Sequence, residues 1–465
     1  MPLLIKSPRI ITATDDYTAD VYCADETITR IEASINPKSC PSNTEVIDAA
    51  GKYLFPGFID PHVHVYLPFM GTYAKDTWET ASRAALVGGT TTLIEMICPG
   101  KADSPLAAFE TWLSKASNIA SCDYTFHMGV TRFDGQAEKE LREIVKRGIR
   151  SFKVFLAYKG ALGVDDRELY HTLKLAKELG VVVTAHCENE TIVAERQAEL
   201  IAAGKTGPEW HEPSRPVQVE AEGVHHLMTF AELTGAEVYV VHTSCNEAVN
   251  EALCAKSRGV KAHIETVIPH LVLDSTYAAK PGFEGAKYVM SPPLRDPAQQ
   301  PKMWNHLRSG AISTIATDHA PFDFEAQKSM GKPSHFGGNS DFTSIPNGIP
   351  SVEDRVNLLY TRGVCTGKID LHTFVATAST NAARIFGLKG KGTITIGADA
   401  DLVVYDPDCR GAISATTHSM ATDYSAFEGW EIKGRPSTVT VRGKIMAQNG
   451  KFTGPQATGK LIPRS

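Results

Sequence analysis

The chain has 465 residues and a formal net charge of −6, with 42% hydrophobic and 22% charged residues. This length exceeds a single ordinary hydrophobic core, so we expect one large domain and a smaller one. The weak negative charge gives no basic surface of the kind that nucleic acids or anionic membranes require, which favours a small molecule as the partner.

No apolar run approaches the ~20 residues of a membrane span, and no apolar leader follows Met1, which together predict a cytoplasmic protein. The nine cysteines include no C-x-x-C pair. This pattern favours reduced thiols over a disulfide framework or a cysteine zinc site.

Both ends of the chain have the pattern of short β-strands divided by turn-forming residues. The N-terminal strands are predicted at residues 3–6, 20–23 and 28–31. The C-terminal strands are predicted within residues 392–405, 438–442 and 445–448. Neither end can bury a sheet alone, so residues 1–55 and 391–450 are predicted to pair into one β-sandwich, followed by a tail at 451–465.

Residues 56–390 alternate apolar β-type runs with helical stretches, as βα units around a parallel sheet do. The predicted strands are residues 55–60, 91–96, 124–130, 151–156, 181–186, 238–242, 261–266 and 312–318. Eight such strands predict an α/β protein with a (β/α)8 TIM-like barrel. An open doubly wound sheet is the alternative, although no G-x-G-x-x-G sequence follows any strand.

The helix after the first predicted strand illustrates the pattern. Asp76 is predicted to cap its N-terminus, with Glu79 three residues on as in a capping box. Gly88 and Gly89 are predicted to end it.

Metal-ligating side chains stand where the predicted strands end, which is where barrel enzymes carry their catalytic groups. The first strand leads into His62 and His64, and residues two apart share one face of a strand. Sixteen histidines would produce some H-x-H pairs by chance, so further ligands are needed. The fifth, sixth and eighth strands end in His186, His242 and Asp318, which predicts a metal site.

Four histidines and an aspartate exceed the three protein ligands of one catalytic zinc ion, which favours two zinc ions. Two cations at the ~3.5 to 4 Å separation of such sites repel, and an anion must bridge them. Lys153 lies within the apolar fourth strand. Either it pairs with Glu95 or Glu265, or its buried amine loses a proton and takes up carbon dioxide to form a bridging carbamate. The residues alone leave both possibilities open.

These motifs resemble the cyclic amidohydrolases of the amidohydrolase superfamily, and more narrowly the dihydropyrimidinase and hydantoinase branch. The matching stretches are residues 57–64, 151–153, 185–186, 207–211, 241–242, 290–295, 317–322, 345–348 and 397–403. The resemblance implies a barrel with a composite β-sandwich, two zinc ions per subunit bridged by a carbamylated lysine and a hydroxide, and a homotetramer.

Roles for single residues follow from the same resemblance. The implied metal ligands are His62, His64 and Asp318 for one zinc ion, His186 and His242 for the other, and carbamylated Lys153 (N6-carboxylysine) for both. Asp318 is also implied to transfer the proton in catalysis, and Tyr158 to stabilise the oxyanion. Ser291 and Asn347 are implied to bind the amide edge of the substrate.

The implied reaction is the hydrolytic opening of 5,6-dihydropyrimidines, such as dihydrouracil and dihydrothymine, to N-carbamoyl-β-amino acids. Hydantoins substituted at position 5 are expected as further substrates, and a D-hydantoinase with these as its main substrates is an alternative. A non-enzymatic interaction protein of the same fold is a second alternative, but the chain keeps all six metal positions. A mononuclear deaminase of the same superfamily is a third alternative. Such enzymes usually lack a lysine in the fourth strand, so Lys153 disfavours it.

Two further features bear on the substrate. Tyr66 stands where dihydroorotases have an arginine and allantoinases an asparagine. Residues 67–70, together with Phe155 and Leu162, are predicted to form an apolar rim suited to a neutral ring. Residues 323–344 are predicted to form a surface loop, the alternative being a segment that shapes access to the site.

Overall fold

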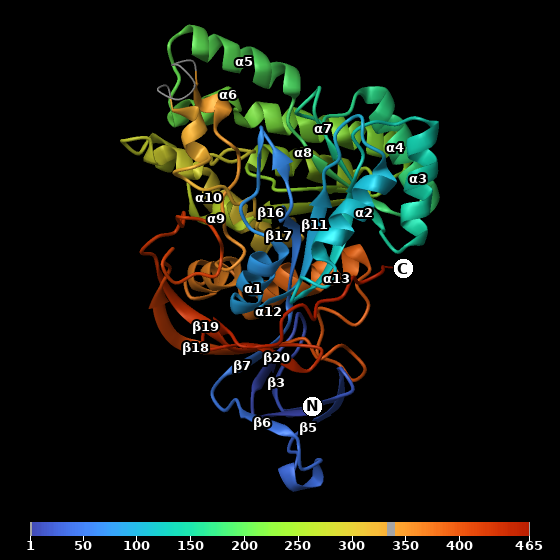
Figure 1. The fold of residues 1–465 in the computed structure, drawn as a ribbon, viewed down its shortest axis with the longest axis vertical. Helices are drawn as coiled ribbons and strands as arrows, with labels where there is room; N and C mark the ends of the chain where they lie inside the picture. The colour runs from blue at the N-terminus through green and yellow to red at the C-terminus, as the bar shows by residue number, and fades with distance from the viewer. Residues whose placement is uncertain (1, 333–339, 465) are drawn as a thin grey trace.

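The computed structural model describes residues 2–332 and 340–464. Helices surround a barrel in the upper part of Figure 1, and strands from both ends of the chain lie together below it. The predicted fold class, an α/β barrel with a small β-sandwich built from both termini, is confirmed. The residue boundaries of 1–55, 56–390 and 391–450 stay predictions.

Eight parallel strands form the barrel in the order β17-β16-β15-β14-β13-β12-β11-β8. They are β8 (Phe58–Val63), β11 (Thr90–Ile97), β12 (Asp123–Gly129), β13 (Ser151–Phe155), β14 (Val182–His186), β15 (Val238–Val240), β16 (Ala262–Val267) and β17 (Thr314–Ala316). The barrel closes beside β8, where Val63 and His319 form a parallel bridge and the His64 N–H donates to the His319 carbonyl at 2.8 Å. Because both faces of this sheet are covered, its strands are almost wholly buried.

The helices follow the strands in sequence and cover the barrel (Figure 1). They are α1 (Trp78–Val87), α2 (Pro105–Ala116), α3 (Gly135–Lys146), α4 (Asp166–Leu179), α5 (Glu190–Ala202), α6 (His211–Ser214), α7 (Val217–Thr234), α8 (Asn246–Ser257), α9 (Ile268–Val272), α10 (Gln299–Arg308), α11 (Arg355–Leu359), α12 (Leu371–Val375) and α13 (Asn381–Phe386). None of the helices in the described residues is both long enough and apolar enough to span a membrane.

The predicted cap of α1 is wrong. Thr77 and Thr80 form the capping box, whereas Asp76 is buried one residue earlier. Its carboxylate accepts from the Thr80 hydroxyl at 2.6 Å and lies 2.9 Å from His319 Nε2. Asp76 is therefore engaged with the end of the eighth strand and does not cap the helix. The predicted end at Gly88 is confirmed.

Two further sheets make up the sandwich. The four-stranded sheet, in the order β5-β4-β1-β6, contains β1 (Leu3–Lys6), β4 (Asp20–Ala24), β5 (Thr27–Glu32) and β6 (Glu45–Asp48). The seven-stranded sheet, in the order β21-β20-β19-β18-β7-β2-β3, contains β2 (Arg9–Ile11), β3 (Asp16–Thr18), β7 (Tyr53–Pro56), β18 (Leu402–Ala412), β19 (Glu431–Val441), β20 (Lys444–Gln448) and β21 (Lys451–Phe452). Antiparallel pairing of β7 with β18 joins the two ends of the chain in one sheet.

The predicted first strand at residues 55–60 is in fact two strands. β7 ends at Pro56 in the sandwich and β8 begins at Phe58 in the barrel, with Gly57 between them. A Cβ atom at Gly57 would lie 2.2 Å from Thr91 Oγ1. Glycine is therefore needed where the backbone passes this close to β11 on its way from one sheet to the other.

The prediction that residues 323–344 form a surface loop is wrong for the described part of that segment, while residues 333–339 lie outside the described residues. Phe324, Lys328 and Phe342 are buried there. The segment is held against the C-terminal part of the chain, since the Phe324 and Glu325 N–H groups donate to the Asp423 carboxylate at 2.7 and 3.0 Å.

Candidate metal centre

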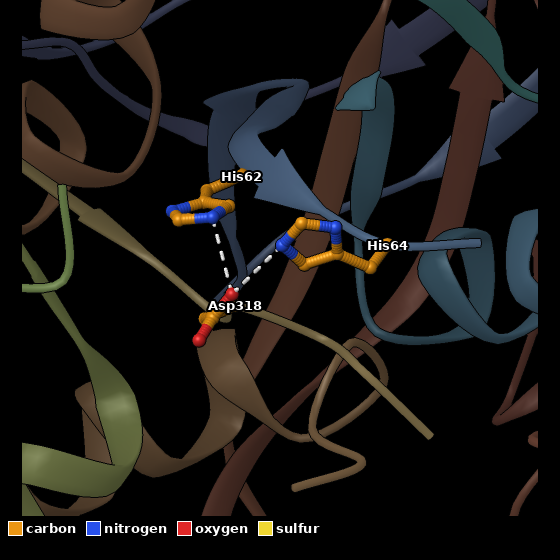
Figure 2. Close-up of side chains that lie close together, drawn as sticks. All are labelled: His62, His64 and Asp318. Atoms are coloured by element: carbon orange, nitrogen blue, oxygen red, sulfur yellow. Dashed lines mark ion pairs between the residues drawn. The ribbon is translucent and has the colours of Figure 1, made fainter. Parts of the chain in front are cut away.

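Three predicted ligands converge at the carboxyl ends of β8 and β17. His62 Nε2 lies 3.1 Å and His64 Nε2 lies 3.3 Å from Asp318 Oδ1. Figure 2 shows both rings directed at this carboxylate, His62 from β8 and His64 from just after its end. All three side chains are buried, and ligand atoms from each lie within 4.8 Å of one another. This set of two nitrogens and one oxygen could hold a divalent metal ion.

His186 and His242 form an adjoining pair at the ends of β14 and β15. His186 Nδ1 lies 2.9 Å from His242 Nε2. The His62 and His242 ring centroids are 5.3 Å apart, so the pair borders the first group. Because His186 Nε2 lies 2.7 Å from Glu188 Oε2 and can donate its proton there, Nδ1 is left as a lone-pair donor. Two ring nitrogens that meet in this way suit a shared cation.

Lys153 projects from the middle of β13 into the same cavity as these ligands. Its side chain is fully buried, and Nζ has no hydrogen-bond partner among the described residues. Desolvation lowers the pKa of Lys153 to about 8, so this amine loses its proton more readily than an exposed lysine does. Among residues 2–332 and 340–464, no ion pair joins Lys153 to Glu95 or Glu265, the partners considered in the alternative interpretation.

Two buried glutamates orient the imidazoles from behind. Glu265 Oε1 lies 2.8 Å from His62 Nδ1, which leaves His62 Nε2 facing Asp318. Glu188 is fixed in turn by Arg215, whose Nη1 donates to Oε2 at 2.7 Å. Desolvation raises the pKa of Glu188, but the Arg215 charge and the His186 hydrogen bond lower it to about 2. Such carboxylate–histidine pairs are typical of protein metal sites.

Glu188 and Arg215 were not predicted as site residues, and Glu265 was considered only as a possible partner of Lys153. Glu188 carried a usable signal, because it follows His186 at the same two-residue spacing as the H-x-H pair. Glu265 also carried one, as an acid inside an apolar predicted strand. Arg215 carried none, since its partner lies 27 positions away in the sequence.

Three predicted site residues have a left-handed backbone conformation, which residues other than glycine rarely adopt. The φ angles are 60° at Tyr158, 37° at His242 and 51° at Asp318. Each such residue costs about 1–3 kcal/mol, and structures retain this strain chiefly at functional sites. At Asp318 the backbone is fixed by its N–H, which donates to the His62 carbonyl at 3.0 Å.

The predicted substrate-binding residues line one cavity with all of the predicted metal ligands except His62. The cavity has about 450 Å³ of atom-free space, open solvent included, and is bordered by Tyr158, Ser291 and Asn347. The Asn347 side-chain amide donates to the Tyr158 hydroxyl at 3.3 Å. Of the predicted apolar rim, Leu67, Phe69, Phe155 and Leu162 line the cavity.

Pro68 and Met70 of the predicted rim are not among the cavity-lining residues, and neither is Tyr66, which precedes the rim. Its ring stacks on Tyr73 with centroids 5.8 Å apart and meets the edge of Trp112 at 4.9 Å. These contacts turn the tyrosine away from the cavity, so its place beside the H-x-H pair does not bring it to the substrate.

Fold and site together define a barrel protein with a group of side chains able to hold metal. A model of the "Amidohydrolase family" matches residues 53–446. A D-hydantoinase from Geobacillus stearothermophilus is 43% identical, over 100% of this chain and 97% of the relative. A dihydropyrimidinase from Rattus norvegicus is 37% identical, over 99% and 88%. A solved structure of a D-hydantoinase (dihydropyrimidinase) from Thermus sp. is 58% identical, covers 99% of both chains and has a TM-score of 0.95.

The chain belongs to the amidohydrolase family. The predicted resemblance to the dihydropyrimidinase and hydantoinase branch is confirmed. The prediction that the protein is an enzyme of the cyclic amidohydrolase class is also confirmed.

Proposed function

We propose that the protein hydrolyses the ring of neutral cyclic ureides, namely dihydrouracil and dihydrothymine, together with 5-substituted hydantoins. The convergence of two sets of ligands around Lys153, in a cavity bordered by Tyr158, is the observation that supports this proposal most strongly. Relatives named D-hydantoinase support hydantoins as the main substrates, and relatives named dihydropyrimidinase support the pyrimidine rings.

Two zinc ions are proposed as the cofactor. His62, His64 and Asp318 would hold one ion, His186 and His242 the other, and a carbamate on Lys153 both. The residues fit this group because His62 Nε2 and Lys153 Nζ are buried without hydrogen-bond partners among the described residues. Such ions supply a hydroxide at neutral pH and polarise a carbonyl group.

The other steps fall to side chains of this protein. The Tyr158 hydroxyl would donate a hydrogen bond to the ring carbonyl oxygen as it gains negative charge. Asp318 would accept the proton of the attacking water and return it to the departing ring nitrogen. Backbone groups at Ser291 and Asn347 would hold the planar amide edge. The homotetramer and the cytoplasmic location also stay proposals.

The wild-type protein is expected to hydrolyse dihydrouracil with a kcat/KM at least ~10²-fold above that for dihydroorotate, which is the same ring with a carboxylate. Entry of the carboxylate requires desolvation, and no arginine is among the described residues that line the cavity. The ratio corresponds to roughly 2.7 kcal/mol of differential binding. Arg295 cannot compensate, because it is bound to Glu220 at 2.8 Å.

Steady-state rates on dihydrouracil, dihydrothymine, phenylhydantoin, allantoin and dihydroorotate measure this preference directly. Comparable efficiency on dihydroorotate would exclude the proposed substrate class, and no hydrolysis of any of the five rings would exclude the proposed function. The order of the first three separates a dihydropyrimidinase from a D-hydantoinase.

A further inference from the structure

A fully buried lysine stands directly behind the residues proposed to hold the substrate. Lys328 begins the short 3-10 turn η5 (Lys328–Gly331) and has no exposed surface. Its Nζ donates to the carbonyls of Val289 at 2.8 Å, Pro346 at 2.7 Å and Gly348 at 2.7 Å. These contacts make Lys328 a direct link between two distant parts of the chain.

The three acceptors match the three N–H donors of an ammonium group. A neutral amine would instead direct its lone pair at one of the carbonyls. Burial lowers the pKa of Lys328 because the ammonium loses its hydration. Hydrogen bonds to an ammonium group favour its charged form. No ion pair with a carboxylate is made by Lys328 in the part of the chain that the structure describes. The buried Lys328 amine is thus bound by backbone carbonyls alone.

Those carbonyls flank the two proposed substrate-binding positions. Val289 lies two residues before Ser291, while Pro346 and Gly348 enclose Asn347. The Val289 carbonyl also accepts from the Gly348 N–H at 3.0 Å, so the two segments are joined at this point. Lys328 therefore links residues 289–291 to residues 346–348, and one residue of each segment, Ser291 and Asn347, lines the cavity.

The neighbouring Gln327 connects this part of the chain to a third segment that lines the cavity. Its side-chain amide donates at 2.7 Å to both Thr72 Oγ1 and the Tyr73 carbonyl. These residues form β10 (Thr72–Tyr73), which pairs with β9 (Pro68–Phe69), and Phe69 lines the cavity. Residues 327 and 328 thus bind three segments that surround the proposed substrate.

We propose that Lys328 is a positioning residue, which holds the backbone at Ser291 and Asn347 in the geometry that binds the amide edge of the ring. The inference rests on the proposed function for the identity of the ligand. Lys328 acts through the backbone of the two segments and makes no contact with the substrate.

Lys328→Met tests this role, because methionine keeps the apolar stem and removes all three donors. Displacement of binding groups by about 1 Å can cost ~10²-fold. KM for dihydrouracil or phenylhydantoin is expected to rise at least ~10-fold, with kcat within about 3-fold of wild type, as loss of uniform binding requires. Hydrogen exchange at residues 289–291 and 346–348 is expected to accelerate, while metal content is unchanged.

Lys391→Met is the matched control. Lys391 is also buried, but its Nζ pairs with Asp123 at 2.6 Å and Asp401 at 2.7 Å, at the amino end of β12 away from the cavity. Its loss is expected to lower stability without changing KM. Lys328→Gln, which keeps two donors, is expected to raise KM less than Lys328→Met and replaces it if that variant does not fold.

An unchanged KM in the Lys328 variants would overturn the proposal, as would a KM that rises equally in Lys391→Met. If the wild type hydrolyses none of the five rings, the proposed function fails. The exchange comparison then still decides on Lys328, since equal exchange in wild type and Lys328→Met would show that the lysine does not hold the two segments.

Discussion

Lys153→Ala is expected to lose metal and activity together. The proposed carbamate is the anion that the protein itself supplies between the two cations, and alanine cannot replace it. The variant should retain fewer than two ions per chain, and kcat/KM should fall by ~10²-fold or more, the scale on which removing an electrostatic contact with the transition state acts. Metal analysis and steady-state kinetics on the same preparation measure both. Added acetate or propionate should restore part of each.

Lys177→Ala is the control for this change, since Lys177 is exposed on α4. It should keep the metal content and rate of the wild type. If Lys153→Ala keeps the metal content and activity of the wild type, the proposed carbamate bridge is refuted. The buried amine would then have a structural role.

Asp318→Asn is expected to lower kcat by at least ~10²-fold, because asparagine keeps the shape of the side chain but cannot accept and return a proton. The same carboxylate is proposed to bind metal, so loss of the ion would also lower the rate. Kinetics should therefore be measured after reconstitution with excess zinc, with the bound metal determined in parallel. A fully metallated Asp318→Asn with unchanged kcat would remove Asp318 from the proton transfer.

The sequence was sufficient to predict the barrel, because each strand is a compact apolar run. The carboxyl ends of parallel strands lie at the same edge of the sheet. This is why His62, His64 and Asp318 could be grouped although the aspartate lies more than 250 positions from the histidines. The break at Gly57 was missed because the run is apolar on both sides of it, although the Pro56-Gly57 pair is a turn signal. Its cause is the close approach of Thr91, a tertiary contact.

The supporting residues of the site were harder to predict than its ligands. A ligand at a strand end is defined by local sequence, whereas Arg215 and Lys328 act through partners on other segments. Asp76 shows the same limit, because its position favours a helix cap but its carboxylate is bound by His319. In each case a tertiary contact determines the role of a polar side chain, and the local sequence pattern does not predict that contact.

The binuclear centre is tested most directly by elemental analysis of the wild-type protein, with activity followed as metal is removed and restored. The account predicts about two zinc ions per chain at full activity and loss of activity on prolonged chelation. Full activity with at most one tightly bound divalent ion per chain would contradict it.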